Sequence, residues 1–179
     1  PFATAVRYHR KKFFEFLERH SKHFRKGATG PRSFRVRILD VPGIVDLGRD
    51  GSPIIEREHE VKIQLPSRFP MEKARVVPVT RLFHPNVSIR EKDICYSGYW
   101  PSLQDDLVSW VLARTTGVIQ YALVTEEEPH NRMNPDAAAW YRKWRGDNPN
   151  FFPLGRVLRF YDPAPRQAAL KIRVGQGAS

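Results

Sequence analysis

The sequence has little cysteine and no long apolar run. Cys95 is the single cysteine, which excludes an internal disulfide and every zinc site built from several cysteines. No uninterrupted stretch reaches the ~18 apolar residues that a membrane-spanning helix needs, and the first residues lack the apolar core of a secretion signal. We therefore expect a cytoplasmic protein that has no metal site, needs no cofactor and does not bind membranes.

The length and charge of the chain narrow the function classes. Its 179 residues, 41% of them hydrophobic, are enough for one domain with its own core. We expect that domain over 1–162 and a flexible tail over 163–179. The net charge of +11 favours an acidic partner, either nucleic acid or protein. Nucleic acid is the weaker alternative, because no Gly-rich phosphate loop, zinc spacing or aromatic-basic RNA motif is present.

Hydrophobic periodicity predicts an α+β domain. Apolar residues recur at three- and four-residue steps over 4–26, which predicts a helix that Gly27 and Gly30 end. Alternating patterns predict strands over 33–39 and 54–65, separated by a turn-rich stretch over 42–53. A third apolar strand is expected over 75–80, where Pro78 indicates either an edge strand or the end of a strand. A helix followed by an antiparallel meander is typical of α+β domains with segregated elements.

The second half begins with an irregular segment over 83–101, and long irregular segments in compact domains usually carry function. Asp105 or Asp106 is then expected to cap a helix that runs to about residue 124. A further helix is expected over 135–144, with Asn134 as its cap. The apolar stretch 151–161 is compatible with either a helix or a strand.

Cys95 lies within the irregular segment, nine residues after Asn86. A lone cysteine is most often a small buried hydrophobic residue. Its place in a loop favours exposure instead, and a reacting thiol needs exposure.

Several motifs in this region resemble one known family. Residues 63–87 follow an aliphatic-Pro-x-x-aromatic-Pro pattern, a strand and then His84-Pro85-Asn86 without a gap. Ile94-Cys95, Trp100-Pro101 and the stretch 134–141 follow in register. This arrangement, which covers about residues 5–145, resembles the ubiquitin-conjugating enzymes.

The resemblance implies a fold and an activity. It implies an N-terminal helix, an antiparallel meander, a cysteine-bearing irregular segment and C-terminal helices. Cys95 would accept the C-terminus of a ubiquitin-like modifier from an activating enzyme as a thioester and pass it to an acceptor amine, expected to be lysine. Asn86 would stabilise the oxyanion that forms in the second step, and His84 would brace the turn that carries Asn86.

The resemblance also implies partner surfaces. The family binds its activating enzyme through the first helix, where Arg10, Lys11, Arg19 and Lys22 supply charge here. Alternatively, these charged residues only form the solvent-exposed face of the helix and bind no partner. The apolar ligase-binding position is Met71, but the loop 100–103 departs from the family pattern, so a ligase or a target protein remains an open partner.

One expected catalytic feature is missing from its usual place. Family members carry an acidic residue that helps to deprotonate or to position the incoming lysine, whereas this chain has Asn131 at that position. His130, Asp93 and Asp136 are the alternative proton acceptors. This divergence suggests a bacterial ubiquitin-like conjugation operon of the kind that acts in phage defence.

A non-catalytic interaction module of the same fold is the main rival interpretation. Such modules lack the active cysteine, so the combination of Cys95 and Asn86 argues against it. Trapping an adduct on Cys95 would discriminate between the two.

Overall fold

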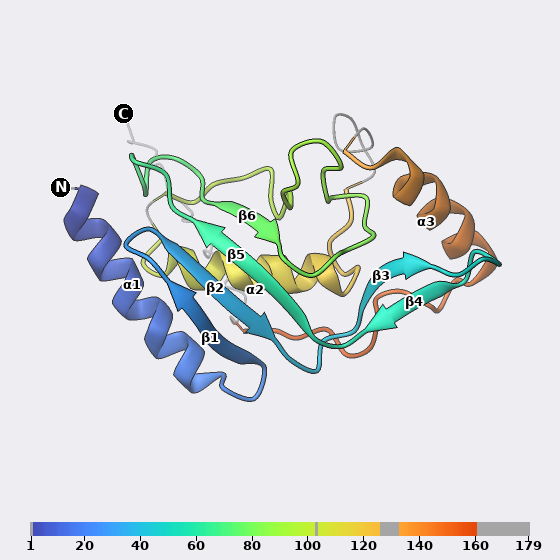
Figure 1. The fold of residues 1–179 in the computed structure, drawn as a ribbon, viewed down its shortest axis with the longest axis horizontal. Helices are drawn as coiled ribbons and strands as arrows, with labels where there is room; N and C mark the ends of the chain where they lie inside the picture. Colours follow the sequence, from blue (N-terminus) through green and yellow to red (C-terminus); the bar gives the residue numbers. More distant parts are fainter. Residues whose placement is uncertain (1, 103, 126–132, 161–179) are drawn as a thin grey trace, which may run out of the picture.

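The computed structural model describes residues 2–102, 104–125 and 133–160. Its elements follow the order helix, six strands, helix, helix (Figure 1). They are α1 (Phe2–Arg19), β1 (Phe24–Thr29), β2 (Ser33–Ile38), β3 (Gly43–Leu47), β4 (Pro53–Glu56), β5 (His59–Gln64), β6 (Arg75–Pro78), α2 (Leu107–Ile119) and α3 (Pro135–Asp147). The segment between β6 and α2 contains no helix or extended strand in its described residues, as expected.

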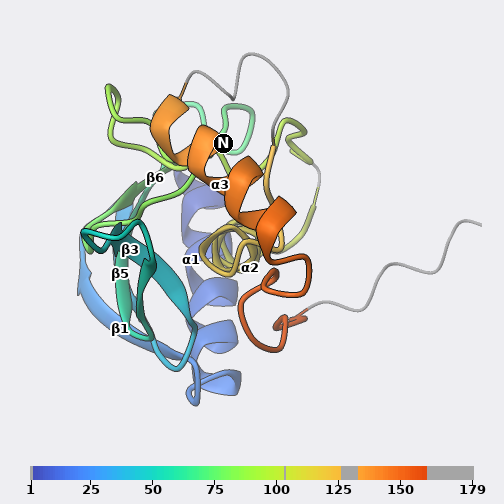
Figure 2. The ribbon, with the colours of Figure 1, turned by 90° about the vertical axis from the view of Figure 1, so that its right-hand side faces the viewer.

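The main sheet has four antiparallel strands in the order β1-β2-β5-β6. The alternating side chains of Phe34, Val36 and Ile38 in β2 are fully buried, and α1 and α2 lie on that side of the sheet (Figure 2). β6 is an edge strand, so the backbone N–H that Pro78 lacks is not needed for a hydrogen bond to another strand. The sheet thus presents β6, and the irregular segment after it, at the margin of the domain.

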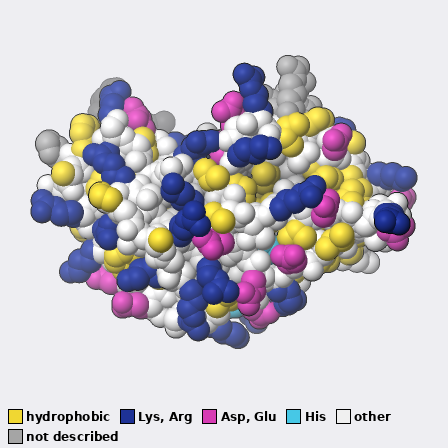
Figure 3. All heavy atoms as spheres, viewed as in Figure 1, with side chains coloured by type: hydrophobic (Ala, Val, Ile, Leu, Met, Phe, Trp, Pro, Cys, Tyr) yellow, Lys and Arg dark blue, Asp and Glu magenta, His cyan; other side chains and the backbone are white. Residues whose placement is uncertain are grey.

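The open face of the sheet is polar. Basic and acidic side chains lie next to one another across it in Figure 3. Arg35 pairs with Glu60 and Arg37 with Glu58, each at 2.9 Å between nitrogen and oxygen. Part of the excess positive charge is therefore offset locally on this face.

A separate β3–β4 hairpin extends beyond the main sheet towards α3 (Figure 1). Gly51 in its turn has a φ of 80°, a conformation that glycine adopts without strain. The Trp140 Nε1 of α3 donates to the Gly51 carbonyl at 2.9 Å. This contact fixes α3 against the hairpin.

The core lies between the sheet and the helices. Phe13 and Phe16 of α1 and Leu107 and Leu112 of α2 are at most 1% exposed and belong to one apolar cluster with the inward side chains of the sheet. A smaller cluster around Tyr121 and Tyr141 joins α3 to the end of α2. None of the helices in the described ranges is long and apolar enough to cross a membrane.

The first expected helix was wrong at its C-terminal end. α1 ends at Arg19, and Phe24 begins β1, where it pairs with Ile38. Phe24 satisfies the helical spacing by coincidence, because a strand residue facing the same core also has to be apolar. Gly27, expected to end the helix, lies within β1, where an added Cβ would approach the Arg35 carbonyl oxygen to 3.2 Å.

Other boundaries also differ from the sequence expectation. The strand expected over 54–65 is two strands, β4 and β5, and the stretch 42–53 contains β3. α2 stops at Ile119 rather than near residue 124, because Tyr121 adopts a φ of 56° and the backbone N–H of Ala122 turns back to the Gly117 carbonyl. Residues 151–160 form neither a helix nor a strand. Residue 161 and the expected tail over 163–179 lie outside the described residues.

The expected fold class is nonetheless confirmed. The chain combines an N-terminal helix, an antiparallel sheet, an irregular cysteine-bearing segment and later helices. α3 begins where expected, and the Asn134 side chain caps it by accepting a hydrogen bond from the Ala137 N–H at 3.1 Å.

Candidate active site

Cys95 is positioned by its buried neighbour. The Ile94 side chain is 3% exposed, and its backbone N–H donates to the Val76 carbonyl of β6 at 2.8 Å. Ile94 also forms an isolated bridge with Val87. Cys95 follows at the rim of the core, is half-buried, and lines a groove of about 390 Å³ beside β6. The side chain is therefore held at the surface by a residue that packs inward.

Asn86 and Cys95 are joined by two hydrogen bonds. The Cys95 N–H donates to the Asn86 carbonyl at 2.8 Å. The Asn86 side-chain Nδ2 donates to the Cys95 carbonyl at 2.9 Å. Together these bonds fix the His84-Pro85-Asn86 turn beside the cysteine.

The Asn86 amide also contacts Thr125 through both of its polar atoms. Its Oδ1 accepts from the Thr125 N–H at 2.9 Å, and its Nδ2 lies 3.3 Å from Thr125 Oγ1. Asn86 is only 2% exposed. In this arrangement the amide connects three segments, and it can donate to a reacting oxygen only by exchanging the longer bond to Thr125.

His84 supports the turn from below. Its Nδ1 accepts a hydrogen bond from the Asn86 N–H at 2.9 Å, which places the proton of the neutral ring on Nε2. Burial lowers the pKa of His84 to about 3, so the ring is neutral near pH 7. Its ring centroid lies 4.2 Å from that of Tyr121, and the side chain is 1% exposed. His84 is thus enclosed beneath the turn and does not line the Cys95 groove.

Sequence reasoning missed Tyr121 and Thr125. The Tyr121 hydroxyl donates to the Phe83 carbonyl, and burial raises the pKa of this phenol well above its ordinary value. Both residues follow α2: Tyr121 lies within the stretch expected to be helical, and Thr125 comes just after its expected end near residue 124. No local motif marks them, because their partners lie 38 and 39 residues earlier in the chain.

The Cys95 groove is mixed in charge. Lys73 donates to the Ser97 carbonyl, and its Nζ lies 4.6 Å from the centre of the Tyr96 ring. Asp93 also lines the groove, and its Oδ2 lies 3.6 Å from Arg75 Nε. Within the described part of the chain, no three His, Cys, Asp or Glu side chains gather in a way that would hold a metal ion.

The alternative proton acceptors are separated by the structure. Asp93 shares the groove with Cys95, whereas Asp136 lines a different depression next to Ile89 and Arg81. His130 and Asn131 lie outside the described residues, so their relation to the thiol stays a prediction.

Known proteins resemble this chain in sequence and in fold. The ubiquitin-conjugating enzyme E2 21 of Caenorhabditis elegans is 26% identical over 114 residues, which cover 64% of this chain and 50% of that enzyme. The chain thus spans about half the length of this curated relative. A putative ubiquitin conjugating enzyme from Trypanosoma cruzi superposes with a TM-score of 0.54 at 17% identity, over 79% of this chain and 92% of that structure. The chain is a divergent relative of the ubiquitin-conjugating enzymes.

Human ubiquitin-conjugating enzyme E2 G1 superposes with a TM-score of 0.47 at 16% identity, covering 62% of this chain and 90% of that structure. No family model matches the sequence.

The four basic residues expected to bind an activating enzyme are not equivalent in this ubiquitin-conjugating fold. Lys11 has an 80% exposed side chain and lies 4.0 Å from Glu15. Arg10 instead donates to the Gly30 carbonyl at 2.7 Å. Arg19 is the exposed last residue of α1, and Lys22 lies beyond the helix in the turn that precedes β1.

A second exposed surface combines the Met71 loop with the Trp100 loop. Trp100 Nε1 donates to the Pro70 carbonyl at 2.7 Å and so ties the two loops together. Met71 is 60% exposed and Tyr99 is 71% exposed. The expected ligase-binding position therefore lies on the surface although the sequence around it departs from the family pattern.

Proposed function

We propose that the protein is a ubiquitin-like-protein conjugating enzyme that carries its modifier on Cys95. The observation that supports this most strongly is the pairing of Asn86 with Cys95, at 2.8 Å and 2.9 Å through two hydrogen bonds. These bonds hold a buried asparagine amide beside a half-buried cysteine, where the amide is placed to donate to an oxyanion that forms on a Cys95 thioester. The distant relationship to a ubiquitin-conjugating enzyme supports the same conclusion.

In the first proposed step, the Cys95 thiolate attacks the thioester carbonyl of the modifier on its activating enzyme. A new bond forms between Cys95 Sγ and the modifier, and the cysteine of the activating enzyme leaves as a thiolate that takes up a proton. One thioester replaces another, so the step is nearly isoenergetic. It needs no cofactor, and no base has to be paired with Cys95.

In the second proposed step, an acceptor amine attacks the Cys95 thioester. The carbonyl oxygen becomes an oxyanion, and Asn86 Nδ2 donates to it after releasing Thr125 Oγ1. Collapse expels the Cys95 thiolate and leaves an amide bond, with lysine as the proposed acceptor. Asp93 is the proposed acceptor of the amine proton because it lines the same groove.

His84 is proposed to position Asn86 and not to act as a base. A ring with a pKa of about 3 is a poor proton acceptor at neutral pH, and its Nδ1 already accepts from the Asn86 N–H. Tyr121, packed against the ring, would fix the same turn.

The proposed partners are a ubiquitin-like modifier, its activating enzyme and a ligase or target protein. α1, with Lys11 as an exposed member of the basic set, is the proposed site for the activating enzyme. A bacterial origin and a role in phage defence stay predictions from the sequence.

The test is intact-mass spectrometry of the protein after incubation with ubiquitin, or each of a panel of ubiquitin-like modifiers, together with the matching activating enzyme and ATP. We expect one modifier to add its mass less one water, and dithiothreitol to remove it. The absence of an adduct with any modifier would favour the non-catalytic interaction module, and an adduct that resists dithiothreitol would contradict a thioester on Cys95.

A further inference from the structure

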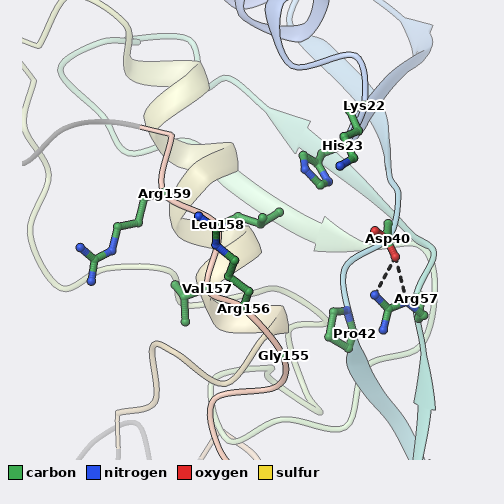
Figure 4. A pocket seen from close by; sticks show the side chains of 10 residues that line it. All are labelled: Lys22, His23, Asp40, Pro42, Arg57, Gly155, Arg156, Val157, Leu158 and Arg159. Atoms are coloured by element: carbon green, nitrogen blue, oxygen red, sulfur yellow. Dashed lines mark hydrogen bonds and ion pairs between the residues drawn. The ribbon is translucent and has the colours of Figure 1, made fainter.

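A cavity of about 760 Å³ lies apart from the Cys95 groove and shares no lining residue with it. One wall comes from the turn after α1, the β2–β3 connection and the β4–β5 turn. The other wall is the segment 155–159 that follows α3 (Figure 4). The Cys95 chemistry proposed above uses none of these residues, although Lys22 also belongs to the basic set expected to bind an activating enzyme.

Most of the charged side chains that line the cavity are cations. Its charged lining residues are Lys22, Asp40, Arg57, Arg156 and Arg159. Arg57 donates through Nε and Nη2 to Asp40 Oδ1 at 2.9 Å and 2.6 Å, and this hydrogen bonding lowers the pKa of Asp40. Among the described residues, no ion pair neutralises Lys22, Arg156 or Arg159.

The side chains approach the gap from both walls. In Figure 4, Lys22 and His23 project from one wall and Arg156 lies on the other, while Arg159 points away from Asp40. Lys22 and Arg156 are therefore the unpaired cations that the two walls contribute to the cavity.

The C-terminal wall is held in place by Gln120 at the end of α2. Gln120 is 1% exposed, and its Nε2 donates to the Arg156 carbonyl at 2.9 Å and to the Leu154 carbonyl at 3.2 Å. Its Oε1 accepts from the Leu158 N–H at 3.2 Å. A wall fixed in this way loses little conformational entropy when a ligand binds.

Gly155 brings the two walls together at the bottom of the cavity. It has a φ of 63°, and an added Cβ would lie 3.2 Å from Pro42 Cγ. Pro42, Val157 and Leu158 add apolar lining. The cavity thus combines a cationic rim with an apolar portion.

We propose that this cavity binds a small phosphate-bearing anion. Its volume falls within the ~300–1,000 Å³ of small-ligand sites. Arginine and lysine are the side chains that recognise phosphate, arginine through two parallel N–H donors. Cations on two facing walls fit a compact anion that bridges them, whereas an acidic peptide would suit a continuous basic strip.

The experiment is a calorimetric titration of the full chain with sodium pyrophosphate at low salt. The double variant Lys22→Glu/Arg156→Glu should bind at least ~10-fold more weakly. The control Arg49→Glu/Lys143→Glu changes the net charge equally at exposed positions outside the cavity, and it should bind within ~2-fold of the wild type. Thermal melts should show that both variants fold, because none of these four side chains has a hydrogen bond to another described residue.

Two further arms identify the source of the phosphate. Inositol trisphosphate in solution and vesicles containing phosphatidylinositol bisphosphate are titrated against the same three proteins. Lys22- and Arg156-dependent binding of the soluble compound supports a soluble ligand, and such binding to vesicles alone supports a lipid headgroup. Equal weakening in both double variants overturns the proposal, as does the absence of binding in every arm. Binding of an octaglutamate peptide that depends on Lys22 and Arg156, without binding of any phosphate compound, would also overturn it.

Discussion

Replacing Asn86 with alanine is the perturbation whose outcome the structure defines most fully. The change deletes an amide that makes hydrogen bonds of 2.9 Å to the Cys95 carbonyl and 2.9 Å from the Thr125 N–H, and a longer contact of 3.3 Å to Thr125 Oγ1. It therefore leaves one carbonyl and one N–H without their partner. The side chain is 2% exposed, so the deletion also opens a small cavity.

The cost in stability follows from these two orphaned groups. A buried polar group that loses its partner costs ~1–3 kcal/mol. Cys95 and Thr125 are both half-buried, so water can reach part of the vacated space and the lower end applies to each. We expect a loss of about 2 kcal/mol, which lowers the melting temperature of a domain this size by roughly 4–8 °C.

The effect on catalysis is separable from this loss. Well below its melting temperature, Asn86→Ala should still accept the modifier from the activating enzyme, because thioester exchange is nearly isoenergetic. It should then discharge to free lysine ~10²–10³-fold more slowly, as expected for one lost oxyanion donor. Single-turnover discharge of preloaded protein, run beside thermal melts, measures both quantities.

Thr125→Val is the matched control. It keeps the backbone N–H that donates to Asn86 Oδ1 and removes the hydroxyl that competes for Nδ2. It should cost less than ~1 kcal/mol, since one long hydrogen bond is lost, and discharge should be at least as fast as in the wild type. Normal stability of Asn86→Ala would refute the structural account of the amide, and normal discharge would refute its catalytic role.

Two other predictions test the partner surface and the buried ring. Lys11→Glu should slow the loading of Cys95 at low salt, because an exposed cation speeds association with an acidic partner. The melting temperature should fall only slightly, since the side chain is 80% exposed and its one ion pair, with Glu15, is 4.0 Å long. Loading as fast as in Lys143→Glu would show that Lys11 is only a solvated surface residue, and Arg10 is less suitable because its guanidinium is hydrogen-bonded. Burial lowers the pKa of His84 to about 3, so the unfolded chain takes up a proton before the folded one as the pH falls. The free energy of unfolding should therefore fall as the pH drops from about 6.5 to 3. His84→Gln should reduce the slope of this free energy against pH by up to ~1.4 kcal/mol per pH unit in urea titrations. An unchanged slope would contradict a neutral buried ring.

Local patterns in the sequence predicted the elements for which a single periodicity or capping rule is sufficient. The alternation of Phe34, Val36 and Ile38 predicted β2, and the Asn134 cap predicted the start of α3. These rules failed where a helix and a strand would show the same pattern of apolar residues. Phe24 fits both a helical stripe and the first residue of a strand, and only its pairing with Ile38 decides between them.

Long-range pairing also explains the missed hairpin. The alternation of Val61, Ile63 and Leu65 predicts a single strand over 54–65. In the structure, β4 pairs with β3 outside the main sheet, whereas β5 pairs with β2 and β6. A single alternating run does not reveal that its two halves belong to different sheets.

The candidate site divides in the same way. The approach of Asn86 to Cys95 could be expected, because the two lie nine residues apart on one irregular segment. The contact of Asn86 with Thr125 joins residues 39 apart, across α2, and no local signal indicates it. The involvement of Arg10 with the Gly30 carbonyl likewise depends on how α1 packs beside β1.

The most direct test of the central claim is the chemistry of the bond formed at Cys95. Wild-type protein, Cys95→Ser and Cys95→Ala are incubated with activating enzyme, modifier and ATP, and the products are treated with dithiothreitol or with mild hydroxide. We predict an adduct that dithiothreitol removes from the wild type, an ester on Cys95→Ser that resists dithiothreitol but yields to hydroxide, and no adduct on Cys95→Ala. An adduct of undiminished yield on Cys95→Ala would contradict the assignment of Cys95 as the residue that carries the modifier.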